Sequence, residues 1–384
     1  VAQNLPAVCR YYVKMCDADN HAVREAACQA IAELAVRLGD HEEYHDKLQS
    51  QVDVLMQALL MCFHDESWPV RDEACLACGI ICRAYPEECR PELGTLWERW
   101  TEQLTDQIWS VREDAAVALG DALEAYGQEF YQKLKDLLKE LIPSAKKQAA
   151  MTMAEHKARQ NDAAAHTDSQ LFSCGSLAPK LKKRKDGAGR IGCSSCDVTR
   201  ERQLWEATDG AIYLVSEVVK RCCHSDSVVP LTDDEIKEYL RELADVCRVQ
   251  HFPQADDMRA TLWRQVPSIA QELGKERFKR NGYLEIFTDL LFSNLESRTA
   301  SQLAKHAAGQ CAEELAQLIG VPIFRGRLED YQRDIFDDVM RERKAMPKGP
   351  AMGGPSFSPF GPTGLLDGAG GPSAAPPAMF PGRV

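Results

Sequence analysis

Cysteine is the residue type best suited to metal chemistry in this sequence, and Cys193 and Cys196 have the spacing of a zinc-binding pair. A structural zinc ion needs four ligands. The candidates for the remaining ligands are Cys174, Cys222, Cys223 and His224. We expect instead two accessible thiols in a loop, and therefore no bound metal.

The sequence shows little sign of catalytic chemistry. It contains neither a Gly-rich phosphate-binding loop nor a Gly-x-Ser-x-Gly nucleophile motif, and its nine histidines are scattered along the chain. Acidic pairs such as Glu42–Glu43 and Asp337–Asp338 lie in strongly charged stretches, where solvated surface charge is the simplest interpretation. We therefore predict a protein that is not an enzyme, has no catalytic residues and needs no cofactor.

A basic cluster stands out in this acidic chain, whose net charge is −12. Its charged members are Lys180, Lys182, Lys183, Arg184 and Lys185. One interpretation is a nuclear-import signal or a contact with an acidic partner. The other is a solvated run of charge in a loop, and the sequence leaves both open.

Two tryptophans, Trp68 and Trp109, occupy equivalent places, because each follows an aspartate by three residues. Aromatic side chains are common anchors in binding interfaces. Both are therefore candidate partner-binding residues. The alternative interpretation is that each ring packs against a neighbouring structural unit.

Three similar stretches of sequence position these candidates. Each has an Asp followed six or seven residues later by the Arg of a Val-Arg pair. The pairs are Asp17 and Arg24, Asp65 and Arg71, and Asp106 and Arg112. The arginines are 47 and then 41 residues apart, which is the length of two helices with their turns, so the chain is built from repeats.

The apolar pattern gives the helices of each repeat. After every Asp, small apolar residues recur at helical spacing, as at Val70, Ala74, Ala77 and Ile81. A bulkier stripe precedes the third Asp, at Leu93, Trp97, Trp100 and Leu104. Each repeat is therefore predicted to be an antiparallel pair, with a bulky first helix and a small-residue second helix.

The polar residues indicate where helices begin. Ser110 with Glu113, and Thr232 with Glu235, have the spacing of capping boxes. Four carboxylates are expected to place negative charge at the positive ends of second helices. They are Asp72, Glu73, Glu113 and Asp114.

At these residues the chain resembles the HEAT-repeat family, whose second helix begins with an Asp…Arg signature followed by small apolar residues. The resemblance covers residues 1–142 well. It implies a superhelical array with second helices on the concave side, and a ladder in which Asp17, Asp65 and Asp106 pair with Arg24, Arg71 and Arg112. The stretch around Trp68 also resembles loops of TOG domains, a tubulin-binding HEAT subfamily. Those loops are basic, whereas the flanks here are Glu66, Asp72 and Gln107.

We predict an all-α fold, a HEAT/armadillo-like solenoid of stacked antiparallel helix pairs. Residues 1–142 hold about three repeats with a net charge of −13, and residues 143–203 form an irregular basic insertion with a net charge of +6. Residues 204–342 hold degenerate repeats with a net charge of −8, and residues 343–384 form a Pro/Gly-rich disordered tail. The chain begins with Val1, so we expect it to be a fragment.

A solenoid with acidic helices predicts a protein-binding scaffold or adaptor whose partner presents a basic surface or segment. The acidic halves disfavour nucleic acid. The longest run without charged or polar residues, Ala74–Cys82, is too short for a membrane span. Reduced cysteines at helical spacing indicate a cytosolic or nuclear protein. The alternatives are a TOG-like tubulin or microtubule binder and an importin-like transport adaptor. Neither the partner's identity nor the oligomeric state follows from the sequence.

Overall fold

The computed structural model describes residues 4–39, 41–158 and 202–345. Over these residues the chain is built of α-helices, short 3-10 turns and loops, with no strand, so the predicted all-α class is confirmed. The described residues up to Met340 form one compact unit. None of the helices in the described ranges is both long and apolar enough to cross a bilayer.

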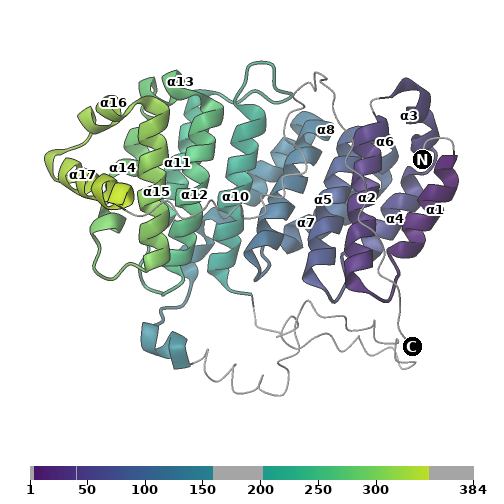
Figure 1. Cartoon of the computed structure of the whole chain (residues 1–384), viewed down its shortest axis with the longest axis horizontal. Coiled ribbons are helices and arrows are strands. Elements are labelled where there is room, and N and C mark those ends of the chain that lie inside the picture. Colours follow the sequence, from purple (N-terminus) through teal and green to yellow (C-terminus); the bar gives the residue numbers. More distant parts are fainter. Residues whose placement is uncertain (1–3, 40, 159–201, 346–384) are drawn as a thin grey trace, which may run out of the picture. The chain divides into compact units, whose positions relative to one another are not determined.

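One row of helices runs through the compact unit, each helix packing against the next (Figure 1). The row consists of α2 (His21–Gly39), α5 (Trp68–Ala84), α8 (Trp109–Leu141), α10 (Leu204–Cys222), α12 (Ala255–Leu273) and α15 (Gln302–Ile319). We call these the second helices. Their consecutive stacking is the arrangement that the sequence repeats predict.

A second set of helices pairs with this row. The first helices are α1 (Leu5–Met15), α4 (Val52–Cys62), α7 (Leu93–Gln103), α11 (Asp233–Val246) and α14 (Tyr283–Glu296). Among them, α1, α4 and α7 pack against α2, α5 and α8, and α14 packs against α15. Short elements complete the unit, and they are α3 (Glu42–Gln49), α6 (Pro86–Cys89), η2 (Arg90–Glu92), η3 (Ile142–Lys147), α13 (Lys275–Arg280), α16 (Val321–Gly326) and the longer α17 (Asp330–Ala345).

Helix α8 serves as two helices, because its backbone leaves the helical conformation at Gly127. The backbone there has φ of 62° and ψ of −137°, a conformation that glycine adopts without steric cost. Residues 109–126 complete the third pair. Residues 128–141 then act as the first helix of a fourth pair, which α10 completes, and Tyr131 hydrogen-bonds Tyr239 of α11 at 3.0 Å. The segment between residues 158 and 202 therefore lies, in the sequence, between the first and the second helix of one repeat.

Small side chains allow the second helices to approach one another closely. Val70, Ala74, Ala77 and Ile81 of α5 are all buried, as the stripe predicts. A Cβ atom added to Gly79 would lie 2.8 Å from the Cα atom of Ala118 in α8. Only a residue without a side chain fits at this contact.

The two predicted capping boxes differ in outcome. Thr232 and Glu235 form the predicted box at the start of α11, with the Thr232 hydroxyl accepting the Glu235 N–H. The box at Ser110 is wrong, because α8 begins after Ile108 and Ser110 lies inside its first turn. The Ser110 hydroxyl instead donates to Asp72 of α5 at 3.0 Å and so joins two adjacent second helices.

Candidate functional site

Buried Arg–Asp pairs join neighbouring repeats. Arg24 of α2 donates from Nε and Nη2 to Asp65 at 2.5 and 2.6 Å, and both side chains are almost fully buried. Its Nη1 donates to the backbone carbonyls of Ala18 and Asp19 at 3.0 and 3.1 Å. Arg24 therefore pairs with the Asp of the following repeat while it holds the turn of its own repeat. Asp17 lies exposed in that turn.

The other predicted ladder residues follow a modified pattern. Arg112 donates to Asp209 of α10 at 2.7 and 2.9 Å, and both side chains are buried. Arg71 donates to the backbone carbonyl of Asp65 at 2.9 Å, and the Asp106 carboxylate accepts the N–H of Ile108 at 2.9 Å. Asp209 was missed because no Asp…Val-Arg stretch marks it in the sequence. These pairs stabilise the stack rather than form a binding site.

A set of five carboxylates lies along α2, α5 and α8, and we call it the acidic strip. Its members are Glu25, Asp72, Glu73, Glu113 and Asp114. Among the described residues, none of the five forms an ion pair with Lys or Arg. Four of them are partly accessible to solvent, while Asp72 is buried beneath them. The strip thus combines partial solvent access with carboxylates that have no direct ion pair in the described ranges.

The pKa values of the acidic strip reflect this crowding. Burial raises the pKa of Asp114 to about 9, and repulsion from Asp72, Glu113 and Glu73 adds to the effect. Burial likewise raises the pKa of Asp72 to about 7, although the hydrogen bond from Ser110 works in the opposite direction. One Asp72 oxygen, Oδ1, is buried without a hydrogen-bond partner. The negative charge here is costly for the folded protein.

The two ends of the acidic strip have different surroundings. At α2, the Gln29 amide donates to Glu73 at 2.9 Å, while burial and nearby Glu25 raise the pKa of Glu73. At α8, burial raises the pKa of Glu113, and the charge of Lys220 in α10 partly offsets this rise. These carboxylates were predicted to lie at helix N-termini. They begin instead at the fifth residue of each helix, beyond the first turn.

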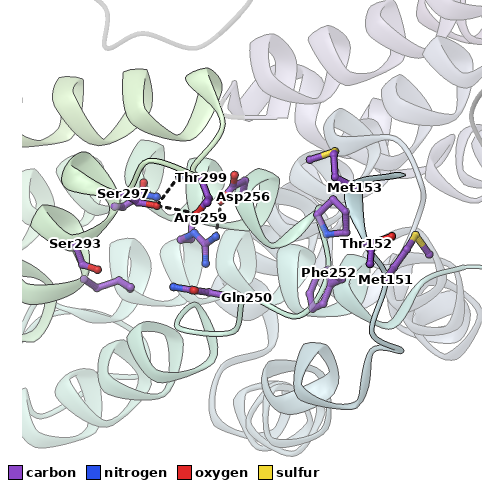
Figure 2. A pocket seen from close by; sticks show the side chains of 13 residues that line it. Met151, Thr152, Met153, Gln250, Phe252, Asp256, Arg259, Ser293, Ser297 and Thr299 are labelled. Atoms are coloured by element: carbon purple, nitrogen blue, oxygen red, sulfur yellow. Dashed lines mark hydrogen bonds and ion pairs between the residues drawn. The ribbon is translucent and has the colours of Figure 1, made fainter. Parts of the chain in front are cut away.

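A separate pocket lies where residues 151–153 approach α12 and α14 (Figure 2). Its volume is about 310 Å³. Arg259 lines it but is held by Asp256 and by the carbonyls of Cys247 and Val249. Asp256 also accepts the Ser301 N–H at 2.6 Å. The charges in this pocket are therefore already paired, and its lining contains no histidine or cysteine to act as a base or nucleophile.

Sequence comparison identifies the repeat type. Residues 55–85, which cover most of α4 and all of α5, match the model of the HEAT repeat family. Residues 55–85 are thus similar to a HEAT repeat, and the described helices around them have the stacked, paired arrangement of a HEAT/armadillo-like solenoid. The predicted resemblance is thereby confirmed, with the match lying on the second helix pair. Comparison with curated protein sequences gives no significant match.

Solved structures with helical repeats show a distant likeness. An engineered protein of the Northeast Structural Genomics Consortium is 14% identical, with 80% of this chain and 96% of that chain covered and a TM-score of 0.35. A designed armadillo repeat protein in complex with the peptide (KR)4 is 14% identical, covering 79% and 98% with a TM-score of 0.33. Kap95p, in a structure with RanGDP, is 15% identical, covering 88% and 38% with a TM-score of 0.31. These likenesses concern the fold alone.

The two tryptophans begin the second helices of successive helix pairs. Trp109, the first residue of α8, is 55% exposed. Trp68, the first residue of α5, is half-buried. Trp109 thus has a ring surface available to a partner, while the side chain of Trp68 is partly covered by the protein and partly exposed to solvent. Their role in binding stays a prediction.

Two predicted features lie outside the described residues. They are the basic cluster, Lys180 to Lys185, and the cysteine pair Cys193 and Cys196. The proposed further ligands Cys222 and Cys223 are both buried at the end of α10. Burial raises the pKa of each thiol.

One metal-like spacing was missed in the sequence, since His41 and His45 flank Glu42 as in a His-Glu-x-x-His motif. That motif requires both histidines on one helix. Here His41 has extended backbone and precedes α3, and its ring packs against Tyr44, while His45 packs against Tyr85. No third ligand converges with them among the described side chains. The spacing therefore does not form a zinc site.

Proposed function

We propose that this protein is a non-enzymatic scaffold that binds an extended, basic segment of a partner protein along the acidic strip. The observation that supports the proposal is the absence of cationic partners for five adjacent carboxylates in the described part of the chain. Because these groups repel one another and are partly desolvated, a Lys or Arg side chain from a partner would relieve a cost that the folded protein carries alone.

The spacing of the helices suits an extended ligand. Packed helices lie about 8–10 Å apart, and an extended chain advances about 3.3–3.6 Å per residue. Successive second helices would therefore meet every second or third residue of the partner. Basic residues at that interval could each reach a carboxylate on α2, α5 and α8. A stacked repeat offers this kind of long surface without a catalytic pocket.

Charge removal within the acidic strip tests the proposal. The probe is a fluorescent peptide of alternating Lys and Arg, and its affinity is measured by anisotropy at low salt. In the double variant Glu73→Gln/Asp114→Asn we expect about tenfold weaker binding, equivalent to about 1.4 kcal/mol. The matched control is Glu98→Gln/Glu129→Gln, which replaces two carboxylates by amides at exposed positions on α7 and α8. Equal affinity of the two variants would reject the acidic strip as the binding surface.

The exposure of Trp109 favours a second candidate, a TOG-like tubulin binder. In that case the partner would meet the starts of the second helices rather than the acidic strip. Co-sedimentation with microtubules, with Trp109→Ala as the test variant, separates the two functions. Pelleting that depends on Trp109 would support the tubulin candidate. No pelleting at low salt would dismiss it.

A further inference from the structure

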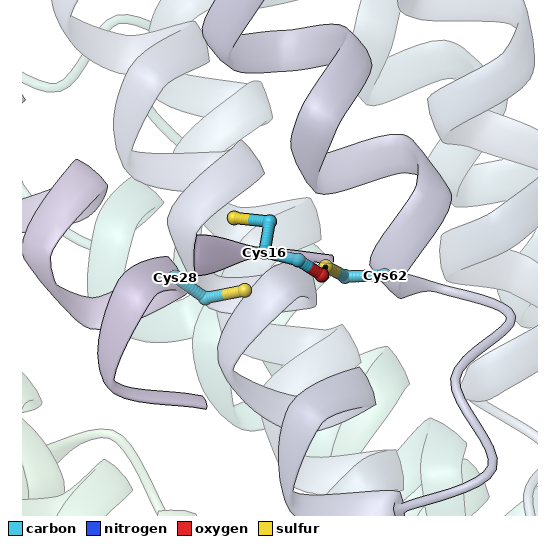
Figure 3. Close-up of side chains that lie close together, drawn as sticks. All are labelled: Cys16, Cys28 and Cys62. Atoms are coloured by element: carbon cyan, nitrogen blue, oxygen red, sulfur yellow. Dashed lines mark hydrogen bonds between the residues drawn. The ribbon is translucent and has the colours of Figure 1, made fainter. Parts of the chain in front are cut away.

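Three cysteines from three different helical elements meet inside the first two repeats (Figure 3). Cys16 ends α1, Cys28 lies in α2 and Cys62 is the last residue of α4. Their sulfur atoms all lie within 4.8 Å of one another, and the three residues are 4%, 0% and 2% exposed. We call them the cysteine triad. Cys16 and Cys62, which are 46 positions apart in the sequence, thus meet with Cys28 at one buried place.

The thiols of the triad interact with one another. Hydrogen bonds from Cys28 and Cys62 lower the pKa of Cys16. Contacts with both partners, together with burial, raise the pKa of Cys28. The thiol of Cys62 also donates to the backbone carbonyl of Cys16 at 3.7 Å. The three thiols are therefore mutual interaction partners at one buried point.

Other buried cysteines lack this arrangement. Cys75 and Cys78 share one face of α5, and Cys311 lies in α15. Burial is the main cause that raises the pKa of each of these thiols. Among the described residues the triad is also the only group of three potential metal ligands whose donor atoms converge. Cys89 has a side-chain hydrogen bond with Cys82 that raises its pKa, but these two cysteines form a pair rather than a group of three.

We propose that Cys16, Cys28 and Cys62 form a binding site for one soft, thiophilic metal ion, of which Cu(I) is the best match. The site offers sulfur alone, and sulfur ligands select soft ions. Zinc takes four ligands in structural sites, and no fourth donor converges here. Cu(I) accepts two or three thiolates. Two metal–sulfur bonds of about 2.3 Å span at most about 4.6 Å, so sulfur atoms that lie within 4.8 Å of one another need only a small further approach to share one ion.

Charge and proton balance are consistent with this site. The guanidinium of Arg24 lies one helical turn before Cys28, where it is paired with Asp65, and it also interacts with the charge of Cys62. The metal enters and stays as Cu(I), so no electron is transferred. Each protonated thiol that becomes a ligand releases its proton to solvent, and affinity therefore increases with pH. Because the triad is buried, loading requires α1 to open locally from α2 and α4.

Anaerobic titration of the reduced full chain with a Cu(I)–bicinchoninate complex tests the proposal. All proteins carry Cys174→Ser, Cys193→Ser and Cys196→Ser, which removes thiols outside the described residues. We expect one Cu(I) per chain in this background. Cys28→Ala should lower the affinity at least 100-fold, whereas Cys311→Ala, an equally buried control, should bind as the background does. Equal binding by the two variants overturns the proposal, as does a background protein that binds no ion.

X-ray absorption on the loaded background protein keeps the proposal testable if Cys28→Ala does not fold. The expected first shell holds two or three sulfur atoms at about 2.2–2.3 Å and no lighter ligand. A nitrogen or oxygen ligand would show that the ion sits elsewhere and would overturn the site. Circular dichroism of each variant establishes whether its helices are intact.

Discussion

Carboxylates occur in two contrasting regions of the second helices. Toward the C-terminal ends of these helices, Asp121 accepts from Arg83 at 2.9 Å and from Arg221 at 3.2 Å, and Arg221 also donates to Glu124 at 2.8 Å. Arginines from α5 and α10 thus neutralise the carboxylates of α8. One to three turns earlier on the same helices, the acidic strip has no such ion pair within the part of the chain that the structure describes. The difference indicates that paired carboxylates fasten repeats together, and that the acidic strip is available to another molecule.

Removal of a paired carboxylate should produce the largest effect. Asp209→Ala leaves the buried Arg112 guanidinium without its counter-charge, so we expect the free energy of unfolding to fall by about 3–5 kcal/mol. Urea denaturation followed by circular dichroism measures this loss. The double variant Arg112→Met/Asp209→Leu removes both charges and should recover most of it. A loss below about 1 kcal/mol for Asp209→Ala would contradict the inference that paired carboxylates fasten neighbouring repeats together.

The pH dependence of stability should reveal the acidic strip. The folded-state pKa of Asp114 is raised to about 9 from 3.8, so the folded protein binds a proton more tightly than the unfolded chain does. Its contribution is therefore fully present below pH 4 and is lost as the pH rises through about 9. Asp114→Asn should then be more stable than the parent by about 1–2 kcal/mol at pH 9 and equal to it near pH 4.

Thermal unfolding at both pH values measures this difference. Asp136→Asn is the matched control, because contacts with Lys139 and Gln132 lower the pKa of that exposed carboxylate on α8. A parent and an Asp114→Asn variant that respond identically to pH would contradict the assignment of uncompensated charge to Asp114.

Removal of an arginine that pairs with the carboxylates near the C-terminal ends of the second helices should have the smallest effect on stability and binding. Arg83→Ala frees part of the charge of Asp121 and Glu124. Because Arg83 is 43% exposed and Arg221 remains, we expect a loss of at most about 1 kcal/mol in stability. Binding of the Lys–Arg peptide should tighten about threefold, since the acidic surface grows. Anisotropy titration measures the gain, and weaker binding would show that Arg83 contacts the peptide directly.

Much of the fold could be predicted because its information is local. The Val-Arg stretches at Arg24, Arg71 and Arg112 mark second helices, and the alternation of bulky and small stripes predicts which helix packs where. The break at Gly127 was not predicted, since the sequence on both sides has good helical periodicity. The role of Asp209 was missed for another reason. Its pairing with Arg112 spans 97 residues and depends on how the fourth repeat closes.

The candidate site was predictable only in part. The acidic character of the second helices follows from their composition, but Asp72, Glu73, Glu113 and Asp114 were assigned to helix ends. Whether a carboxylate is paired depends on contacts between repeats, such as that of Ser110 with Asp72, which no single helix encodes. The cysteine triad is a stronger case, because α1, α2 and α4 each contribute one residue with no shared spacing.

The break at Gly127 has a consequence for the connectivity of the molecule. The fourth repeat takes its first helix from residues 128–141 and its second from α10, with residues 159–201 between them in the sequence. A protease that nicks the chain within this stretch would cut one repeat into halves. The two halves pack against each other through α8 and α10, where Leu134 and Ile212 are buried. The cleaved protein would therefore remain associated without a covalent link.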